Sequence, residues 1–104
     1  MSLAKTFAIY QIHNPQIRRN SDVTFKPTAE LVANHASDYT LVAHIDSWTG
    51  THDNVFLISN SGYHEDLIDR KAPMHSISVG DVIKDLETGK CVVVNRYGFL
   101  DCTL

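Results

Sequence analysis

The sequence has no hydrophobic run long enough to cross a membrane, and it contains few of the residues that build special folds. No apolar stretch approaches the roughly 18 residues that span a bilayer. The first six residues, MSLAKT, do not begin a secretory signal. Two cysteines, three prolines and five glycines exclude a disulfide scaffold and a collagen-like chain. We therefore expect a cytoplasmic protein that does not bind membranes.

The length of 104 residues fits one domain, so residues 1–104 are expected to fold as a single unit. The composition is 43% hydrophobic and 20% charged, which excludes intrinsic disorder. No internal repeat, heptad pattern or low-complexity segment occurs. A chain of this size buries enough surface to form one core without disulfides.

Basic residues are absent from a long central stretch. The chain has nine basic and twelve acidic residues and a net charge of −3, which argues against a domain whose whole surface binds nucleic acid. Residues 38–69 contain no Lys or Arg, but they contain six acidic residues and three histidines. Such a stretch is most often a solvated surface. The alternatives are a contact face for a basic partner and a metal site.

Apolar alternation and capping residues predict the secondary structure. A helix is expected from Pro27 to about His35, because proline suits the first helical turn. Residues 49–60 fit either a buried strand or a helix, and the possible caps Thr49 and Thr51 favour the helix. Strands are expected at residues 6–12, 39–46, 81–85, 90–95 and 99–103.

The remaining segments are expected to be loops. They cover residues 14–26, with a short edge strand at 23–25, and residues 62–75. Strand and helix signals are interspersed along the chain rather than regularly alternating. The sequence therefore predicts an α+β domain with a small, mainly antiparallel sheet of four to five strands packed against one or two short helices.

The final hairpin brings the two cysteines near each other. If Asn95 to Gly98 form its loop, Cys91 lies directly opposite Cys102, whereas a Tyr97-Gly98 loop places the two cysteines diagonally on one face. A directly opposed pair outside the hydrogen-bonded positions suits a disulfide. A cytoplasmic location instead favours two buried, reduced thiols. The spacing of the two cysteines does not fit a zinc motif.

Three segments in the second half of the chain share a pattern with a known family. They are VFLISN at 55–60, HSISVGDVI at 75–83 and YGF at 97–99. Together they resemble the YodL-like domains, small domains encoded by phages, plasmids and conjugative elements. The resemblance covers residues from about Tyr39 to Leu104, and the stretch from Ser78 to Val82 is its most specific part. It implies a short bacterial or viral domain without an established activity, and it supplies no catalytic residues.

No catalytic motif is recognisable, so the sequence leaves open whether the chain is an enzyme, and it predicts no cofactor. Ser76, Ser78 and Thr51 lie near histidines in the sequence, but none sits in a Gly-x-Ser-x-Gly elbow. The histidines at 44, 52 and 64 are eight and twelve residues apart, whereas zinc sites normally need tighter pairs. We therefore assign no catalytic and no metal-binding residue.

We expect a non-enzymatic accessory protein that binds a protein partner through the acidic segment 44–69. The partner is unidentified, and the acidic segment favours a basic one. One alternative is an RNA- or nucleotide-binding module that uses the Gly80 turn and nearby aromatic residues, although Gly80 also suits a simple backbone kink. Another alternative is a metal-dependent hydrolase built from histidines and carboxylates. The oligomeric state is left open. The candidate binding residues are His44, Asp46, Trp48, His52, Asp53, His64, Glu65, Asp66, Gly80 and Tyr97.

Overall fold

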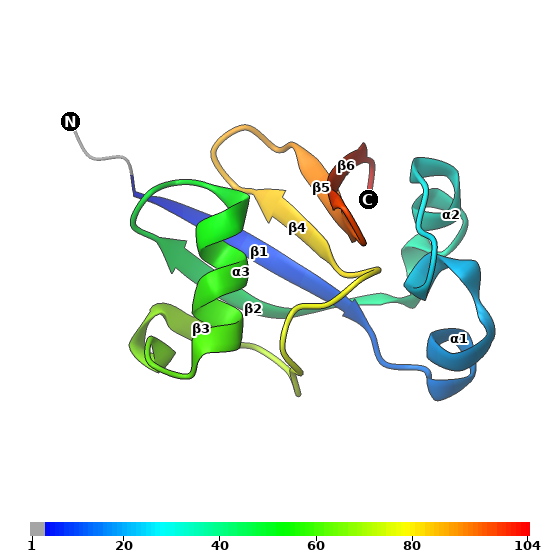
Figure 1. The fold of residues 1–104 in the computed structure, drawn as a ribbon, viewed down its shortest axis with the longest axis horizontal. Helices are drawn as coiled ribbons and strands as arrows, with labels where there is room; N and C mark the ends of the chain where they lie inside the picture. The colour runs from blue at the N-terminus through cyan, green and yellow to red at the C-terminus, as the bar shows by residue number, and fades with distance from the viewer. Residues whose placement is uncertain (1–3) are drawn as a thin grey trace.

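The computed structural model describes residues 4–104, which form one antiparallel sheet with short helices around it (Figure 1). The sheet has six strands in the order β3-β2-β1-β4-β5-β6. All five neighbouring pairs of strands are antiparallel. The α+β class predicted from the sequence is therefore confirmed, with one strand more than the upper expected number. The strands are β1 (Lys5–Ile12), β2 (Tyr39–Ser47), β3 (Ile68–Arg70), β4 (Val82–Asp85), β5 (Cys91–Asn95) and β6 (Gly98–Cys102).

Three α-helices accompany the sheet, and each begins at a side-chain cap. They are α1 (Pro15–Asn20), α2 (Ala29–Asn34) and α3 (His52–Ser61). The side chains of Asn14, Thr28 and Thr51 accept hydrogen bonds from backbone N–H groups of the first turn. α3 ends at Gly62, whose φ of 74° lies in the left-handed region that favours glycine. Among residues 4–104, no helix is long and apolar enough to cross a membrane.

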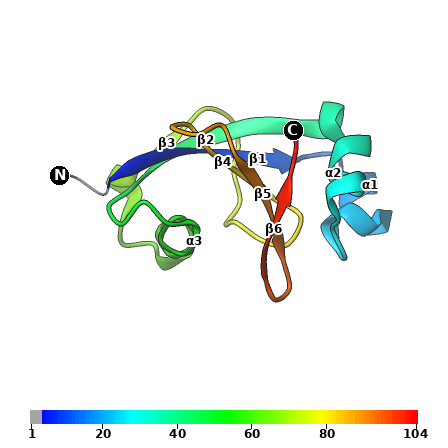
Figure 2. The same ribbon diagram turned by 90° about the horizontal axis from the view of Figure 1, so that it is seen from above.

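The two faces of the sheet carry separate hydrophobic clusters, because neighbouring strand residues point to opposite sides. Ile83 belongs to the cluster beneath α3, whereas Val82 belongs to the cluster beneath α1 and α2. Val92 and Val93 divide in the same way. α3 therefore covers one face, while α1 and α2 gather at the far end of the sheet and close the other face (Figure 2).

The segment 14–26 differs from the prediction of a loop with an edge strand. It contains α1 and the 3-10 turn η1 (Asp22–Thr24), in which Val23 is fully buried. α1 buries none of its side chains, so it has no apolar period that the sequence could reveal. Asn14 and Pro15 are its only local signals, as the cap and the first helical residue.

The segment 62–75 was expected to be a polar loop, but it contains η3 (Glu65–Leu67) and the edge strand β3. β3 pairs with β2 at three positions, including Ile45 with Ile68. Only Ile68 of its three residues is buried. A strand of three residues is too short to show apolar alternation in the sequence. β3 therefore forms because of its pairing with β2.

The β5–β6 hairpin has one of the two predicted registers. Cys91 pairs with Cys102, and the last pair before the turn is Asn95 with Gly98. The turn therefore consists of two residues, Arg96 and Tyr97. The register that places the two cysteines directly opposite each other is confirmed, and the diagonal arrangement does not occur.

Candidate interaction surface

The ten candidate residues lie in three parts of the molecule rather than on one face. His44 and Asp46 lie on β2, where they point away from the buried Ile45 and hence away from α3. Gly80 and Tyr97 belong to the turn before β4 and to the tip of the β5–β6 hairpin. α3 and the segments at its ends hold the remaining six: Trp48, His52, Asp53, His64, Glu65 and Asp66.

The outer face of α3 is partly apolar. Val55 and Ile58 face the core, whereas Asp53, Phe56 and Leu57 face outward, and Leu57 is 51% exposed. This spacing is the normal amphipathic period of a helix, with two large apolar residues on the side where polar ones are expected. The sequence predicted the helix but did not show which of its apolar residues would stay outside the core.

A buried polar contact fixes α3 to the end of β2. Ser47 Oγ donates a hydrogen bond of 2.6 Å to Asn54 Oδ1, and it also accepts from the N–H of Gly50 at 3.0 Å. Both Ser47 and Asn54 are buried. Buried polar groups of this kind cost stability unless they are bonded, so the contact specifies how the loop before α3 folds.

The two loops at the ends of α3 meet through an aromatic contact. The rings of Trp48 and His64 lie 4.9 Å apart between centroids and are tilted by 58°. Trp48 is 45% exposed and Tyr63, next to His64, is 88% exposed. Two exposed aromatic residues therefore flank α3 in the chain, Trp48 before the helix and Tyr63 after it.

Two carboxylates of the acidic segment are paired with basic residues that follow the segment in the sequence. Arg70 Nη1 lies 2.6 Å from Glu65 Oε2, and its hydrogen bond lowers the pKa of the Glu65 carboxyl. Lys71 Nζ lies 2.7 Å from Asp69 Oδ2. Asp53 and Asp66 have no basic side chain within ion-pair distance in the part of the chain that the structure describes. These two carboxylates are the uncompensated acids near α3.

His52 lies behind this surface rather than on it. Its ring packs between Phe7 and Phe99, with both centroid distances at 5.4 Å. Nε2 of His52 is buried and has no hydrogen-bond partner. Burial lowers the pKa of this imidazole, because the charged form loses its hydration. The neutral ring therefore serves as packing between α3 and the hairpin.

An apolar groove of about 440 Å³ runs between α3 and the β5–β6 hairpin. Phe56 of α3 forms one wall, and Val94 and Phe99 of the hairpin form the other. Asp53 and Arg96 also line it. Because Phe56 and Asp53 belong to the outer face of α3 as well, the groove is continuous with that face.

Gly80 has a structural reason to be glycine. Its φ is +95°, and a Cβ at this position would lie 2.7 Å from the carbonyl oxygen of Val23 and 2.8 Å from the Cα of Thr24. The Tyr39 hydroxyl donates a 2.6 Å hydrogen bond to the Gly80 carbonyl. This close approach locks the turn before β4 onto η1, in accord with the backbone-kink interpretation.

A buried polar cluster was not among the predicted site residues. Gln11 Nε2 donates to Asp81 Oδ2 at 3.0 Å and to the His75 carbonyl at 2.9 Å. The Ser78 N–H donates to the same Asp81 oxygen at 2.9 Å. Burial raises the pKa of Asp81 to about 7 despite these bonds. The sequence signals were Gln11 among the apolar residues 7–12 and Asp81 beside the Gly80 turn, and the cluster ties segment 75–81 to β1.

Within residues 4–104 the histidines and carboxylates do not assemble into a metal site. Among residues 4–104, no group of three or more His, Cys, Asp or Glu side chains is placed to hold a metal ion. The predicted alternative of a metal-dependent hydrolase therefore has no candidate ligand set in this part of the chain.

No family model, no curated protein and no solved structure matches the chain. The resemblance to YodL-like domains stays a prediction.

Proposed function

We propose that the chain is a non-enzymatic binding module, that it acts in the cytoplasm, and that its partner is a basic protein held on the outer face of α3 and the loops at its two ends. The exposed apolar side chains in this part of the fold, next to uncompensated carboxylates, are the observation that carries the proposal. We call this region the α3 surface. It consists of Trp48, Asp53, Phe56, Leu57, Tyr63 and Asp66.

The composition of the α3 surface matches what protein interfaces use. Trp48 and Tyr63 are of the residue types enriched at binding hot spots, and Leu57 adds apolar area. Asp53 and Asp66 would attract a basic partner and orient it as it approaches, because uncompensated charges at an interface act mainly on association and specificity. Such a partner would bury the apolar side chains that water now contacts.

The groove beside α3 supports the same proposal. Its apolar walls suit one aliphatic or aromatic side chain of the partner, and Asp53 at its rim suits a neighbouring Lys or Arg. A partner segment that combines an apolar anchor with a basic residue would contact the α3 surface and the groove together.

The RNA-binding alternative has weaker support. Arg18 and Arg19 belong to α1, at the opposite end of the sheet from α3 (Figure 1). Arg96, at the turn of the hairpin, does line the groove beside α3, but it shares the groove with Asp53, and its guanidinium lies 5.7 Å from the ring of Phe25. The exposed aromatics Trp48 and Tyr63 adjoin acidic residues instead, which repel phosphate groups.

The test is a selection of random displayed peptides against the full chain, followed by titration of the selected peptides. Trp48 is the only tryptophan, so its fluorescence reports directly on the α3 surface. We expect the selected peptides to combine Lys or Arg with an apolar residue. Leu57→Ser is expected to weaken their binding about tenfold, since a buried apolar anchor typically contributes more than 1 kcal/mol. Leu100→Ser on β6 is the matched control, because Leu100 is 42% exposed and lies outside the surface.

Two results would overturn the proposal. Peptides that bind the wild type, Leu57→Ser and Asp53→Asn equally well would show that the α3 surface is not the binding site. Tight binding of single-stranded polyuridine that weakens steeply with salt would support the RNA alternative instead.

A further inference from the structure

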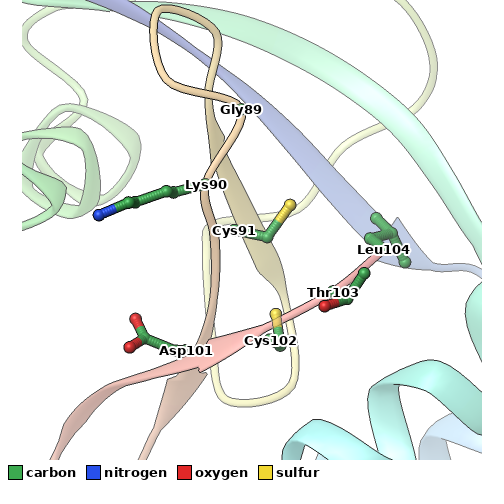
Figure 3. A pocket seen from close by; sticks show the side chains of 7 residues that line it. All are labelled: Gly89, Lys90, Cys91, Asp101, Cys102, Thr103 and Leu104. Carbon is green, nitrogen blue, oxygen red and sulfur yellow. The ribbon is translucent and has the colours of Figure 1, made fainter.

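Cys91 and Cys102 are direct cross-strand partners in the β5–β6 hairpin. Both are free thiols in the structure. Both line a hollow of about 360 Å³. In Figure 3 the side chains of Lys90 and Asp101 point away from the two cysteines. Side chains at opposed positions of an antiparallel pair are within contact range, so the two sulfur atoms are held as neighbours by the register itself.

The backbone hydrogen bonds of β5 show which kind of pair the cysteines form. The N–H of Val94 donates to the carbonyl of Asp81, and the carbonyl of Val94 accepts from the N–H of Gly80, at 2.9 Å each. Gly80 and Asp81 directly precede β4. The carbonyl of Lys90 accepts a hydrogen bond of 2.8 Å from the N–H of Asp85, and so it also points toward β4. Even-numbered residues of β5 therefore direct their backbone groups toward β4, and Cys91 directs its own toward β6.

The pair at Cys91 and Cys102 is thus of the hydrogen-bonded kind, in which Cα atoms lie about 5.5 Å apart. Disulfides accept Cα separations of about 4.4–6.8 Å, so this backbone distance allows a bond. From the sequence, a disulfide is expected only for a pair outside the hydrogen-bonded positions. Because Cys102 is only half-buried, reducing thiols can reach a disulfide at this position and open it again.

The surroundings of the two thiols control how fast they react. Cys91 is buried and Cys102 is half-buried, and the hollow beside them leaves room for a small reactant. Burial, together with the nearby Cys91, raises the pKa of the Cys102 thiol to about 12. The thiolate of Cys102 is therefore scarce at neutral pH, and reactions that need it become faster as the pH rises.

We propose that Cys91 and Cys102 are a redox-responsive thiol pair, which a low-molecular-weight disulfide such as oxidised glutathione converts into a cross-strand disulfide. One protein thiolate attacks the small disulfide, forms a mixed disulfide and releases one glutathione thiolate. The second protein thiol loses its proton and attacks the cysteine sulfur of the mixed disulfide. The cross-strand S–S bond forms, the bond between that cysteine and glutathione breaks, and the second glutathione leaves as a thiolate. Two protein thiols are oxidised and one small disulfide is reduced to two thiols.

The disulfide would restrain the hairpin that carries the exposed Tyr97 at its tip and Phe99 on one wall of the groove. It would also act on α2, since Cys102 packs against the cluster that contains Val32. Oxidation would therefore change the rigidity of this end of the sheet without altering the residues of the α3 surface.

The experiment equilibrates the full chain with mixtures of reduced and oxidised glutathione at constant pH. Free thiols are then blocked with an alkylating reagent, and proteolytic fragments are examined by mass spectrometry. We expect Cys91 and Cys102 to lose their reactivity together, to appear in one linked pair of fragments, and to be recovered by excess reduced glutathione. The effective concentration of the two thiols in the folded chain is expected to exceed that in urea by about tenfold or more, because the register positions them.

Variants separate the internal disulfide from other oxidation products. Cys91→Ser and Cys102→Ser are each expected to stop at a mixed disulfide with glutathione or to stay reduced. Oxidised wild-type chain that carries glutathione on either cysteine, or that forms dimers linked by a disulfide, would overturn the proposal. An effective concentration in the folded chain equal to or below that in urea would also overturn it, and this measurement needs no variant.

Discussion

Gln11 and Asp81 are separated by 70 positions in the sequence, and Gln11 Nε2 donates a hydrogen bond of 3.0 Å to Asp81 Oδ2. Both side chains are buried. The contact links the central strand β1 to the turn that leads into β4, next to the glycine that packs on η1. It places a carboxyl group in the interior with two hydrogen-bond donors, Gln11 and the Ser78 N–H. Nδ1 of His75 lies 4.0 Å from the same carboxyl oxygen, and burial lowers the pKa of this imidazole, which favours its neutral form.

This carboxyl group predicts a specific pH dependence. Its pKa is about 7 in the folded chain, above the ordinary value of 3.8, because burial disfavours the charged form. A raised carboxyl pKa contributes stability that is complete below pH 3.8 and is lost as the pH rises through 7. Asp81→Asn removes this titration. We expect the stability of the variant relative to wild type to increase from pH 4 to pH 8, by on the order of a few kcal/mol.

Urea unfolding of both chains across this pH range measures the difference. A difference in the free energy of unfolding that is the same at every pH would come from the changed hydrogen bonds of Asp81→Asn. A difference that stays the same from pH 4 to pH 8 would contradict the buried, protonated carboxyl group.

His52 predicts a pH dependence of the opposite sign. Burial lowers its pKa below 6.5, so its contribution to stability is present above pH 6.5 and is lost as the pH falls below that value. His52→Phe removes the titration and also the unpartnered Nε2 between two phenylalanine rings. We expect it to stabilise the fold by on the order of 1 kcal/mol at neutral pH, and by more at pH 5.

A second variant divides these two effects. His52→Gln removes the titration but keeps a polar side chain at the site. We expect His52→Gln to lose less stability than the wild type when the pH falls from 8 to 5. At pH 8 it should lack the gain in stability expected for His52→Phe. Urea unfolding at pH 5 and at pH 8 measures both effects. Equal stability curves for His52→Phe and wild type at pH 5 would show that the ring is not buried as described.

Gly80→Ala is expected to destabilise the protein strongly. The new Cβ would lie within 3 Å of the backbone of Val23 and Thr24, at a φ of +95°. We expect a loss of roughly 2 kcal/mol or more, because both backbone strain and a steric clash oppose folding. Gly62→Ala is the matched control, since its φ is +74° but nothing lies within 4 Å of the added atom. Thermal unfolding of the two variants should place Gly80→Ala well below Gly62→Ala, and similar melting temperatures would refute the close contact.

Ser47→Ala is expected to loosen the start of α3. It removes the donor to the buried Asn54 Oδ1 and the acceptor for the Gly50 N–H. An unbonded buried polar group costs about 1–3 kcal/mol. We expect that loss in urea unfolding, together with faster amide exchange at residues 50–54 and a changed fluorescence of the nearby Trp48. Ser61→Ala, at the other end of the same helix, should leave the exchange at 50–54 unaltered.

Most strands and two of the three helices could be predicted because their signals are local. Alternation in β1 and β2, Pro27 near the start of α2 and the cap Thr51 are signals from residues a few positions apart. The structure places Pro27 just before the helix rather than in its first turn, and Thr28 caps α2. α1 was missed because it buries no side chain, and β3 because only Ile68 is buried. The candidate site was predicted as a segment of acidic residues. The structure shows that Glu65 and Asp69 are paired with Arg70 and Lys71, and that His44 lies on the other side of the sheet.

The amino-acid sequence by itself determined the α+β class, the negative central segment and the placement of the two cysteines near each other on one hairpin, because these follow from neighbouring residues and from one tight turn. Only the tertiary structure decided that β1 would lie between β2 and β4, that Gln11 would bond Asp81, and that Phe56 and Leu57 would stay outside the core. These features depend on contacts between distant segments, whose energy exists only once the sheet has assembled and water has been excluded from between its layers.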